Sequence, residues 1–190
     1  SRVYVSHDGG ASVSVIDTGS GVVVDTITVG YRPEGVAVSS DGSRVYVTND
    51  YDASVSVIDT GSGAVVGTIA VGARPQGVAV SSDGSRVYVT NNYGGSVSVI
   101  DTGSASVVDT ITVGGFPTGV AVSSDGSRVY VANSGDGSVS VIDPAFAFPG
   151  GAGGTGGAGG LGGVTAGNGG AGGVGGAGGV GFTGVDGGAG

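Results

Sequence analysis

The side chains that could do acid–base or nucleophilic chemistry are scattered through this sequence rather than grouped. Its one histidine, His7, has no partner pattern around it, and no nucleophile–base arrangement is discernible among the many hydroxyl and Asp side chains. The absence of Cys excludes disulfides and thiolate metal ligands. We therefore expect no catalytic residues, no metal site and no cofactor, with His7 a solvated loop residue.

Aromatic side chains in variable segments are better candidates, because aromatic anchors among small polar residues are typical of recognition surfaces. These segments lie between runs of β-branched residues. The candidate binding residues are Tyr31, Arg32, Glu34, Asp50, Tyr51, Asp52, Gln76, Asn92, Tyr93 and Phe116. The alternative is that loops simply tolerate change and that their aromatic rings pack on neighbouring loops.

The charge pattern restricts the class of partner. The chain carries 15 acidic residues against six Arg, which gives a formal net charge of −9. Nucleic acids and anionic membranes both need a cationic surface, and no run approaches the length of about 18 apolar residues that a membrane helix requires. We expect no nucleic-acid binding and no membrane insertion.

An internal repeat determines the fold that must position these side chains. The segment Ser-Arg-Val-Tyr-Val begins at residues 1, 43, 85 and 127, a spacing of 42 each time. In the second copy, period-two alternation of β-branched residues predicts strands over 44–48, 54–58, 65–71 and 77–81. Asp-Gly pairs at 41–42, 83–84 and 125–126 predict hairpins, because both residues tolerate positive φ.

Four antiparallel strands in each 42-residue unit predict an all-β fold, the β-propeller, in which each unit is a blade. A plain meander, an open solenoid or a sandwich is the alternative. The segments Tyr88-Val89-Thr90-Asn91 and Pro75-x-Gly77-Val78-Ala79 resemble the YVTN-family propeller repeat, and the resemblance covers residues 1–143. Ser6-His7 and Ala132-Asn133 depart from the Thr-Asn pair of that motif.

The strand count predicts an incomplete ring of about 3.5 blades. With strands a to d named from the hub outward, a is expected to begin at Gly35, Gly77 and Gly119. The chain then holds b-c-d, two full blades and a-b-c, whereas propellers close with four to eight blades. Either additional blades of a larger ring or a partner, such as a second copy in a homodimer, would complete it. A piece of a larger propeller is the interpretation that we favour.

Alternate turns of antiparallel strands lie on opposite faces of a propeller. The Ser-Ser-Asp-Gly (a–b) and Asp-Thr-Gly-Ser (c–d) turns share one face and barely vary between copies, whereas the b–c and d–a loops share the other face and vary. A repeat that keeps one face and diversifies the other suggests a scaffold with an interaction surface. Glu34, Gln76 and Thr118 precede the inner strands, so we expect them at the channel mouth.

The two parts of the chain are residues 1–148, the blade repeats, and residues 149–190, a glycine-rich low-complexity tail. The tail is interpreted either as a flexible segment or as stacked polyglycine helices. It resembles the PGRS-type segments of mycobacterial PE/PGRS surface proteins. That resemblance implies a cell-envelope or secreted location.

The favoured functional hypothesis is a non-enzymatic module that binds protein or glycan through the b–c and d–a loops. The first alternative, by analogy with other propellers, is an enzyme of the lactonase or quinoprotein kind with a site at the channel mouth. The second is a purely structural cell-envelope protein whose tail carries the function.

Overall fold

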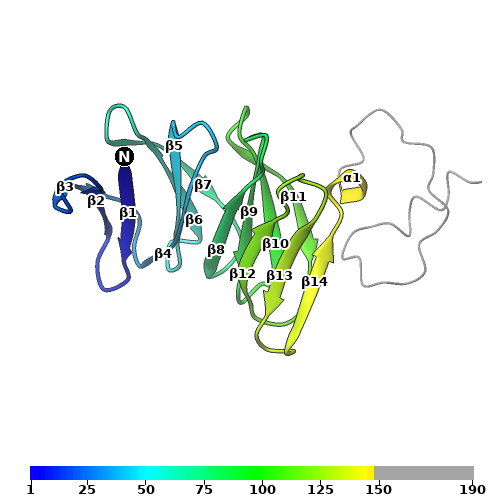
Figure 1. The fold of residues 1–190 in the computed structure, drawn as a ribbon. Helices are drawn as coiled ribbons and strands as arrows, with labels where there is room; N and C mark the ends of the chain where they lie inside the picture. The colour runs from blue at the N-terminus through cyan, green and yellow to red at the C-terminus, as the bar shows by residue number, and fades with distance from the viewer. Residues whose placement is uncertain (148–190) are drawn as a thin grey trace, which may run out of the picture.

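The computed structural model describes residues 1–147, so the glycine-rich tail predicted for residues 149–190 lies outside the described part. The described residues form fourteen β-strands and one short helical turn, α1 (Pro144–Ala147). The strands make four antiparallel sheets that stand side by side (Figure 1). The sheets are numbered blades 1 to 4 in chain order. The prediction of an all-β propeller is confirmed.

The bounds of the strands follow the 42-residue repeat. Blade 1 contains β1 (Arg2–His7), β2 (Ser12–Asp17) and β3 (Val23–Thr28). Blade 2 contains β4 (Pro33–Val38), β5 (Arg44–Asn49), β6 (Ser54–Asp59) and β7 (Ala64–Ala70). Blade 3 contains β8 (Pro75–Val80), β9 (Arg86–Asn91), β10 (Ser96–Asp101) and β11 (Ser106–Thr112). Blade 4 contains β12 (Pro117–Val122), β13 (Val129–Asn133) and β14 (Ser138–Ile142).

Neighbouring strands in each sheet are consecutive in the chain, so every blade is a meander. Blade 1 lacks the inner strand a and blade 4 lacks the outer strand d among the described residues, as the sequence predicted. The inner strands β4, β8 and β12 lie next to one another and connect the blades at the hub.

The inner strands begin two residues earlier than expected, at Pro33, Pro75 and Pro117 rather than at the glycines. The register of β4 against β5 shifts between Pro33 and Val36, and the amide of Gly35 donates instead to Thr48 Oγ1 at 2.8 Å. A Cβ at Gly35 would lie 2.3 Å from the backbone oxygen of Gln76 in the next blade. The glycine therefore marks the close approach of two inner strands and not the start of one.

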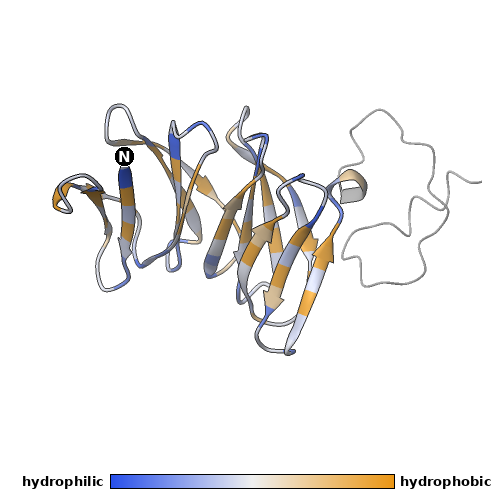
Figure 2. Ribbon diagram, in the orientation of Figure 1, coloured by the Kyte–Doolittle hydropathy of each residue, from blue (hydrophilic) through white to orange (hydrophobic). Residues whose placement is uncertain are grey.

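The hydrophobic core lies between the blades, as the alternating apolar bands along the strands suggest (Figure 2). Each interface joins the face of one blade to the opposite face of the next. The cluster between blades 2 and 3 contains Tyr46, Val55, Val57, Ile69, Val87, Val89 and Ile100. The strand tyrosines Tyr46 and Tyr88 are buried here and in the next interface, whereas Tyr130 in blade 4 is exposed.

The Asp-Gly turns differ in one respect from the predicted hairpin. Of each pair only the glycine has positive φ, at 71° for Gly42 and 72° for Gly84. The amide of Gly42 donates to the carbonyl of Ser39, and the amide of Ser39 donates to that of Arg44. The connection is thus a longer loop in which Asp41 acts through its side chain, since its carboxylate accepts bonds from Ser39 Oγ and from the Ser43 amide.

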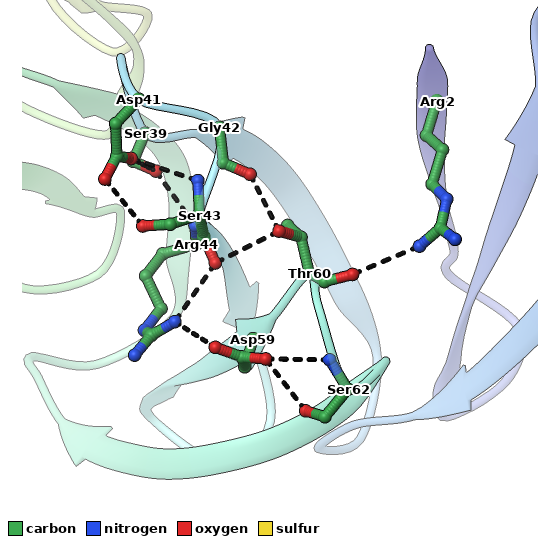
Figure 3. Close-up of polar contacts among 9 residues, drawn as sticks. All are labelled: Arg2, Ser39, Asp41, Gly42, Ser43, Arg44, Asp59, Thr60 and Ser62. Atoms are coloured by element: carbon green, nitrogen blue, oxygen red, sulfur yellow. Dashed lines mark hydrogen bonds and ion pairs between the residues drawn. The ribbon is translucent and has the colours of Figure 1, made fainter.

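Hydrogen bonds join the two kinds of invariant turn into one surface, which is named the turn face. Arg44 forms an ion pair with Asp59, and Thr60 Oγ1 donates to the carbonyl of Gly42 at 2.8 Å (Figure 3). The carboxylate of Asp59 also accepts from the amide and hydroxyl of Ser62. The equivalent ion pairs Arg86–Asp101 and Arg128–Asp143 recur in blades 3 and 4. These charges have a structural role, as their repetition predicts.

The two residues of the Thr-Asn pair in the repeat motif have different structural roles. Thr48 Oγ1 donates to the carbonyl of Gln76 at 2.8 Å and so bonds blade 2 to blade 3. Asn49 Nδ2 donates within the blade to Ser54 Oγ and Ser56 Oγ, at 3.0 and 2.9 Å. The side chain of Asn49 also fills the space above Gly30, where a Cβ would lie 2.5 Å away from it.

Candidate functional site

The b–c and d–a loops meet on the opposite side of the blades, which is named the loop face. The amide of Asp50 donates to the carbonyl of Arg32 at 2.9 Å, and the amide of Asn92 donates to that of Arg74 at the same distance. The third equivalent bond joins Ser134 to Phe116 at 3.1 Å. Each d–a loop is therefore fixed to the b–c loop of the blade that follows it.

The residue at one d–a position is held in the left-handed region of backbone space in every copy. Arg32, Arg74 and Phe116 have φ values of 56°, 55° and 49°. For a residue with a Cβ this conformation costs on the order of 1–2 kcal/mol, and glycine would relieve it. Large side chains nevertheless occupy all three positions, and they project where the loops converge.

Aromatic rings and an arginine form a continuous line across the loops of blades 2 and 3. The Tyr31 and Tyr51 rings meet edge to face with centroids 5.7 Å apart, as do Tyr93 and Phe116 at 6.0 Å. The guanidinium of Arg74 joins the two pairs, because it lies 4.0 Å from the Tyr51 centroid and 5.3 Å from that of Tyr93. These five residues are named the aromatic arc.

The rings of the aromatic arc contact one another and yet stay open to solvent. The four aromatic side chains are 53–67% exposed. The mutual packing of the loop aromatics, which the sequence offered as the alternative to recognition, is therefore part of the geometry, and the rings are accessible as well. Edge-to-face pairs and cation–π contacts of this kind are worth about 0.5–1.5 kcal/mol each, enough to restrict the motion of the rings.

Carboxylates beneath the arc orient its arginines. Asp50 is almost completely buried, and its Oδ2 lies 2.6 Å from Arg74 Nη1 and 3.5 Å from Arg32 Nη1. Asp8 Oδ1 lies 2.6 Å from Arg32 Nε. The pKa of Arg74 is raised by its hydrogen bond to Asp50, and the pKa of Tyr51 is lowered by the adjacent Arg74. Both arginines therefore stay cationic against the rings.

Two other acids support the loops through their backbone. Asp52 Oδ2 accepts a hydrogen bond from the Tyr31 amide at 2.7 Å, and Asp136 Oδ2 accepts one from the Gly115 amide at 2.5 Å. Each acid belongs to a b–c loop and each amide to a d–a loop. Asp52 thus fixes the backbone that carries Tyr31, and we interpret it as a positioning residue of the arc.

The residues predicted for the channel mouth do not precede the inner strands, as the sequence suggested, but are the second residue of each: Glu34 in β4, Gln76 in β8 and Thr118 in β12. Glu34 is half-buried, 3.7 Å from Arg32 Nε, and its pKa is raised by desolvation and by nearby Asp8. Asn92 Nδ2 donates to Gln76 Oε1 and to the carbonyl of Pro117, both at 3.2 Å. Asn92 is buried like Asp50, so these two predicted binding residues lie beneath the surface and support it.

Sequence reasoning missed Arg74, the residue that connects the arc. The available signal was its place in the repeat, because Arg74 occupies the same position as Arg32 and Phe116, both of which were predicted. Within residues 1–147, no group of three or more His, Cys, Asp or Glu residues could hold a metal ion. His7 is an exposed strand residue at the end of β1 rather than a loop residue, and its Nε2 lies 2.7 Å from Ser14 Oγ.

Comparisons with known proteins agree with this fold. Residues 1–86 match the YNCE-like beta-propeller family, and residues 58–145 match the lactonase family, a 7-bladed beta-propeller. Hydrazine synthase of Kuenenia stuttgartiensis is similar in structure, with a TM-score of 0.73 and 33% sequence identity over 76% of this chain and 43% of that chain. The chain thus spans less than half the length of that relative. No curated protein is similar enough in sequence to count as a relative.

The fold and the two family matches together define a β-propeller repeat protein. In the part of the chain that the structure describes, no helix is long and apolar enough to cross a membrane.

Proposed function

We propose that the chain is a non-enzymatic interaction module that binds a protein or glycan ligand on the loop face. The observation that carries this proposal is the aromatic arc, in which exposed rings are aligned by a partly buried ion pair between Arg74 and the buried Asp50. Rigid aromatic side chains lose little conformational entropy on binding, so they are efficient anchors for a ligand.

The charges around the arc favour neutral or cationic ligands. Five carboxylates, those of Asp8, Glu34, Asp50, Asp52 and Asp136, lie in these loops or at their edge, against the two arginines Arg32 and Arg74. Because both arginines are already engaged by acids, little positive charge is left for an anionic ligand. Neutral oligosaccharides and linear peptides without acidic residues are the ligands to test first.

The test uses an array of neutral oligosaccharides and a displayed library of linear peptides, probed with the wild-type chain. The variant Tyr51→Ala/Tyr93→Ala/Phe116→Ala should lose at least about tenfold in affinity for any ligand found, since aromatic anchors dominate interface energies. The matched control is Ser40→Ala/Ser82→Ala/Ser124→Ala, which changes three exposed serines of the turn face. Equal binding by both triple variants would overturn the proposal.

A catalytic function at the channel mouth is the second candidate, supported by the lactonase match over residues 58–145. Glu34 would be the general base, because desolvation raises the pKa of its carboxyl and a raised pKa suits proton transfer near neutral pH. Hydrolysis of a series of simple lactones by the wild-type chain, lost in Glu34→Gln, would favour this candidate. The absence of turnover by the wild-type chain would favour the interaction module over the enzyme.

The cell envelope or the extracellular space is the location we propose, and it rests on the resemblance of residues 149–190 to PGRS-type segments. A structural role in the envelope would place the function in that tail instead of in the loop face. Cell fractionation of the full chain and of a variant without residues 149–190 separates these ideas. Release of the truncated chain from the envelope would assign retention to the tail.

A further inference from the structure

Blade 4 exposes an apolar face that is buried in the other blades. Val97 in blade 3 is 0% exposed, whereas its equivalent Val139 in blade 4 is 62% exposed. Tyr88 is 2% exposed and its equivalent Tyr130 is 44% exposed. In blades 1 to 3 this face packs on the following blade, so it is named the forward face.

Blade 1 exposes the opposite, or backward, face. Val3 is 47% exposed, although its equivalents in the other three blades are each 0% exposed. Val5 is 40% exposed, and its equivalents are also fully buried. Those buried equivalents are Val45, Val87 and Val129 for the first position, and Val47, Val89 and Val131 for the second.

These two bare faces are the halves of one interface that the chain already makes three times. Between blades 3 and 4, Tyr88 and Val97 of the forward face pack in one cluster with Val129 and Val131 of the backward face. On the forward face of blade 4, Tyr130 and Val139 are the equivalents of Tyr88 and Val97. On the backward face of blade 1, Val3 and Val5 are the equivalents of Val129 and Val131. Their side chains are therefore complementary in type and spacing, because the sequence repeats both.

A departure from the repeat motif fits this pairing. Thr48 and Thr90 each donate a hydrogen bond to a backbone carbonyl on the inner strand of the following blade, and Ser6 does so to Glu34. Blade 4 has Ala132 at this position. Among the described residues, blade 1 is the one blade without an inner strand, the element whose carbonyl accepts this bond at the other junctions.

We propose that a second copy of this chain covers these faces, with the forward face of blade 4 of each copy seated on the backward face of blade 1 of the other. Each copy contributes two four-stranded and two three-stranded blades, so two such junctions close a ring of eight blades, a number that propellers adopt. The contact is heterologous, since each junction joins two different faces, and closure with two copies prevents growth into a filament.

Light scattering behind a sizing column tests the pairing, with the full chain measured over a dilution series. The wild-type chain should have twice the mass of one chain. The variants Val139→Arg and Val3→Arg should each be monomeric, because each places a charge in both junctions. Val108→Arg, at an exposed valine of the outer strand β11, should remain a dimer and serves as the matched control.

Mixing the two monomeric variants tests the head-to-tail geometry. Val139→Arg keeps an intact backward face and Val3→Arg keeps an intact forward face, so an equimolar mixture should form a 1:1 dimer through a single junction. Circular dichroism of each variant checks that it is folded. A monomeric or ladder-forming wild type, a variant that stays dimeric alone, or a mixture that stays monomeric overturns the proposal. A monomeric wild type would mean that other parts of the chain, or further blades, cover the two faces.

Discussion

The left-handed d–a position shows backbone strain maintained at a surface. Phe116 has a φ of 49° and an exposed ring, so its side chain contributes to the aromatic arc more than to the core. Phe116→Gly should keep or raise the free energy of unfolding, by up to about 1 kcal/mol, because glycine adopts this conformation without strain. The same variant should bind any loop-face ligand more weakly.

Urea denaturation and a binding titration of Phe116→Gly measure the two effects separately. Phe116→Tyr is the control, since it retains both the strain and the ring. A loss of stability greater than that of Phe116→Tyr would mean that the ring supports the fold rather than a ligand.

The hydrogen bonds of Thr90, one of which joins two blades, contribute a measurable part of the free energy of unfolding. Its Oγ1 accepts from the Gly77 amide at 2.7 Å and donates to the Thr118 carbonyl at 2.8 Å, and the residue is fully buried. Thr90→Val keeps the shape but leaves both backbone groups unpaired, which should destabilise the fold by about 1–3 kcal/mol. Thr90→Ser keeps the hydroxyl and should cost less in urea denaturation. Equal losses would mean that the hydroxyl contributes no more to stability than the methyl group that Thr90→Ser removes.

The turn aspartates make the fold sensitive to acid. The pKa of Asp41, Asp83 and Asp125 is lowered from the usual 3.8 to about 2, chiefly by the hydrogen bonds that the hydroxyls of Ser39, Ser81 and Ser123 donate to them. A carboxyl whose pKa is lower in the folded state stabilises the fold above its unfolded pKa. That contribution is lost as the pH falls from about 4 through 2.

Thermal melts between pH 7 and pH 2 measure this acid loss. The melting temperature should fall most steeply below pH 4, and the variant Asp41→Asn/Asp83→Asn/Asp125→Asn should start lower at pH 7 and fall less on acidification. Asp25→Asn, which changes an exposed acid on the outer strand β3, is the control. If acidification lowers the melting temperature of the triple variant as much as that of the wild type, the acid sensitivity does not come from these turns.

At the scale of the strands, a glycine beside the buried asparagine explains why one repeat position never varies. A Cβ at Gly72 would lie 2.4 Å from Asn91 Cγ, and Asn91 is fixed by hydrogen bonds to Ser96 and Ser98. Gly72→Ala should therefore cost about 1–3 kcal/mol, as overpacking does elsewhere.

The matched control is Gly67→Ala in the outer strand β7, where nothing lies within 4 Å of an added Cβ. The equivalent residues in the neighbouring blades are Asp25 and Asp109, so the position accepts a side chain. This control should be neutral or stabilising by a few tenths of a kcal/mol. Chemical denaturation measures the free energy of unfolding of both variants. Equal decreases would mean that strand flexibility, rather than the contact with Asn91, determines the destabilisation.

The strands could be predicted from the sequence because alternation, turn residues and a fixed period all reported the same element. The start of strand a was wrong, since the close contact of Gly35 with the next blade is a tertiary feature that no local pattern contains. The loop aromatics were found by residue type. Arg74 and the burial of Asp50 were missed, because both depend on loops that are 24 residues apart and meet only in the fold.

At the scale of the whole molecule, stability should fall from the central blades toward the ends. In a repeat fold each unit gains most of its stability from its two neighbours, so a unit with one neighbour opens more easily. Among the described residues, blades 2 and 3 each have both faces buried, whereas blades 1 and 4 each have one bare face.

Native-state hydrogen exchange measures this gradient strand by strand. In a dilute sample, amides of β9 and β10 should exchange slowest, and those of β1 and β14 at least about tenfold faster, a difference of about 1.4 kcal/mol in opening free energy. If two copies form a ring, raising the protein concentration should slow exchange in β1 and β14 and leave β9 and β10 unchanged. Val139→Arg should keep the dilute pattern at every concentration. Uniform protection in the dilute sample would mean that the blades unfold as one cooperative unit, and the bare faces would then carry no local penalty.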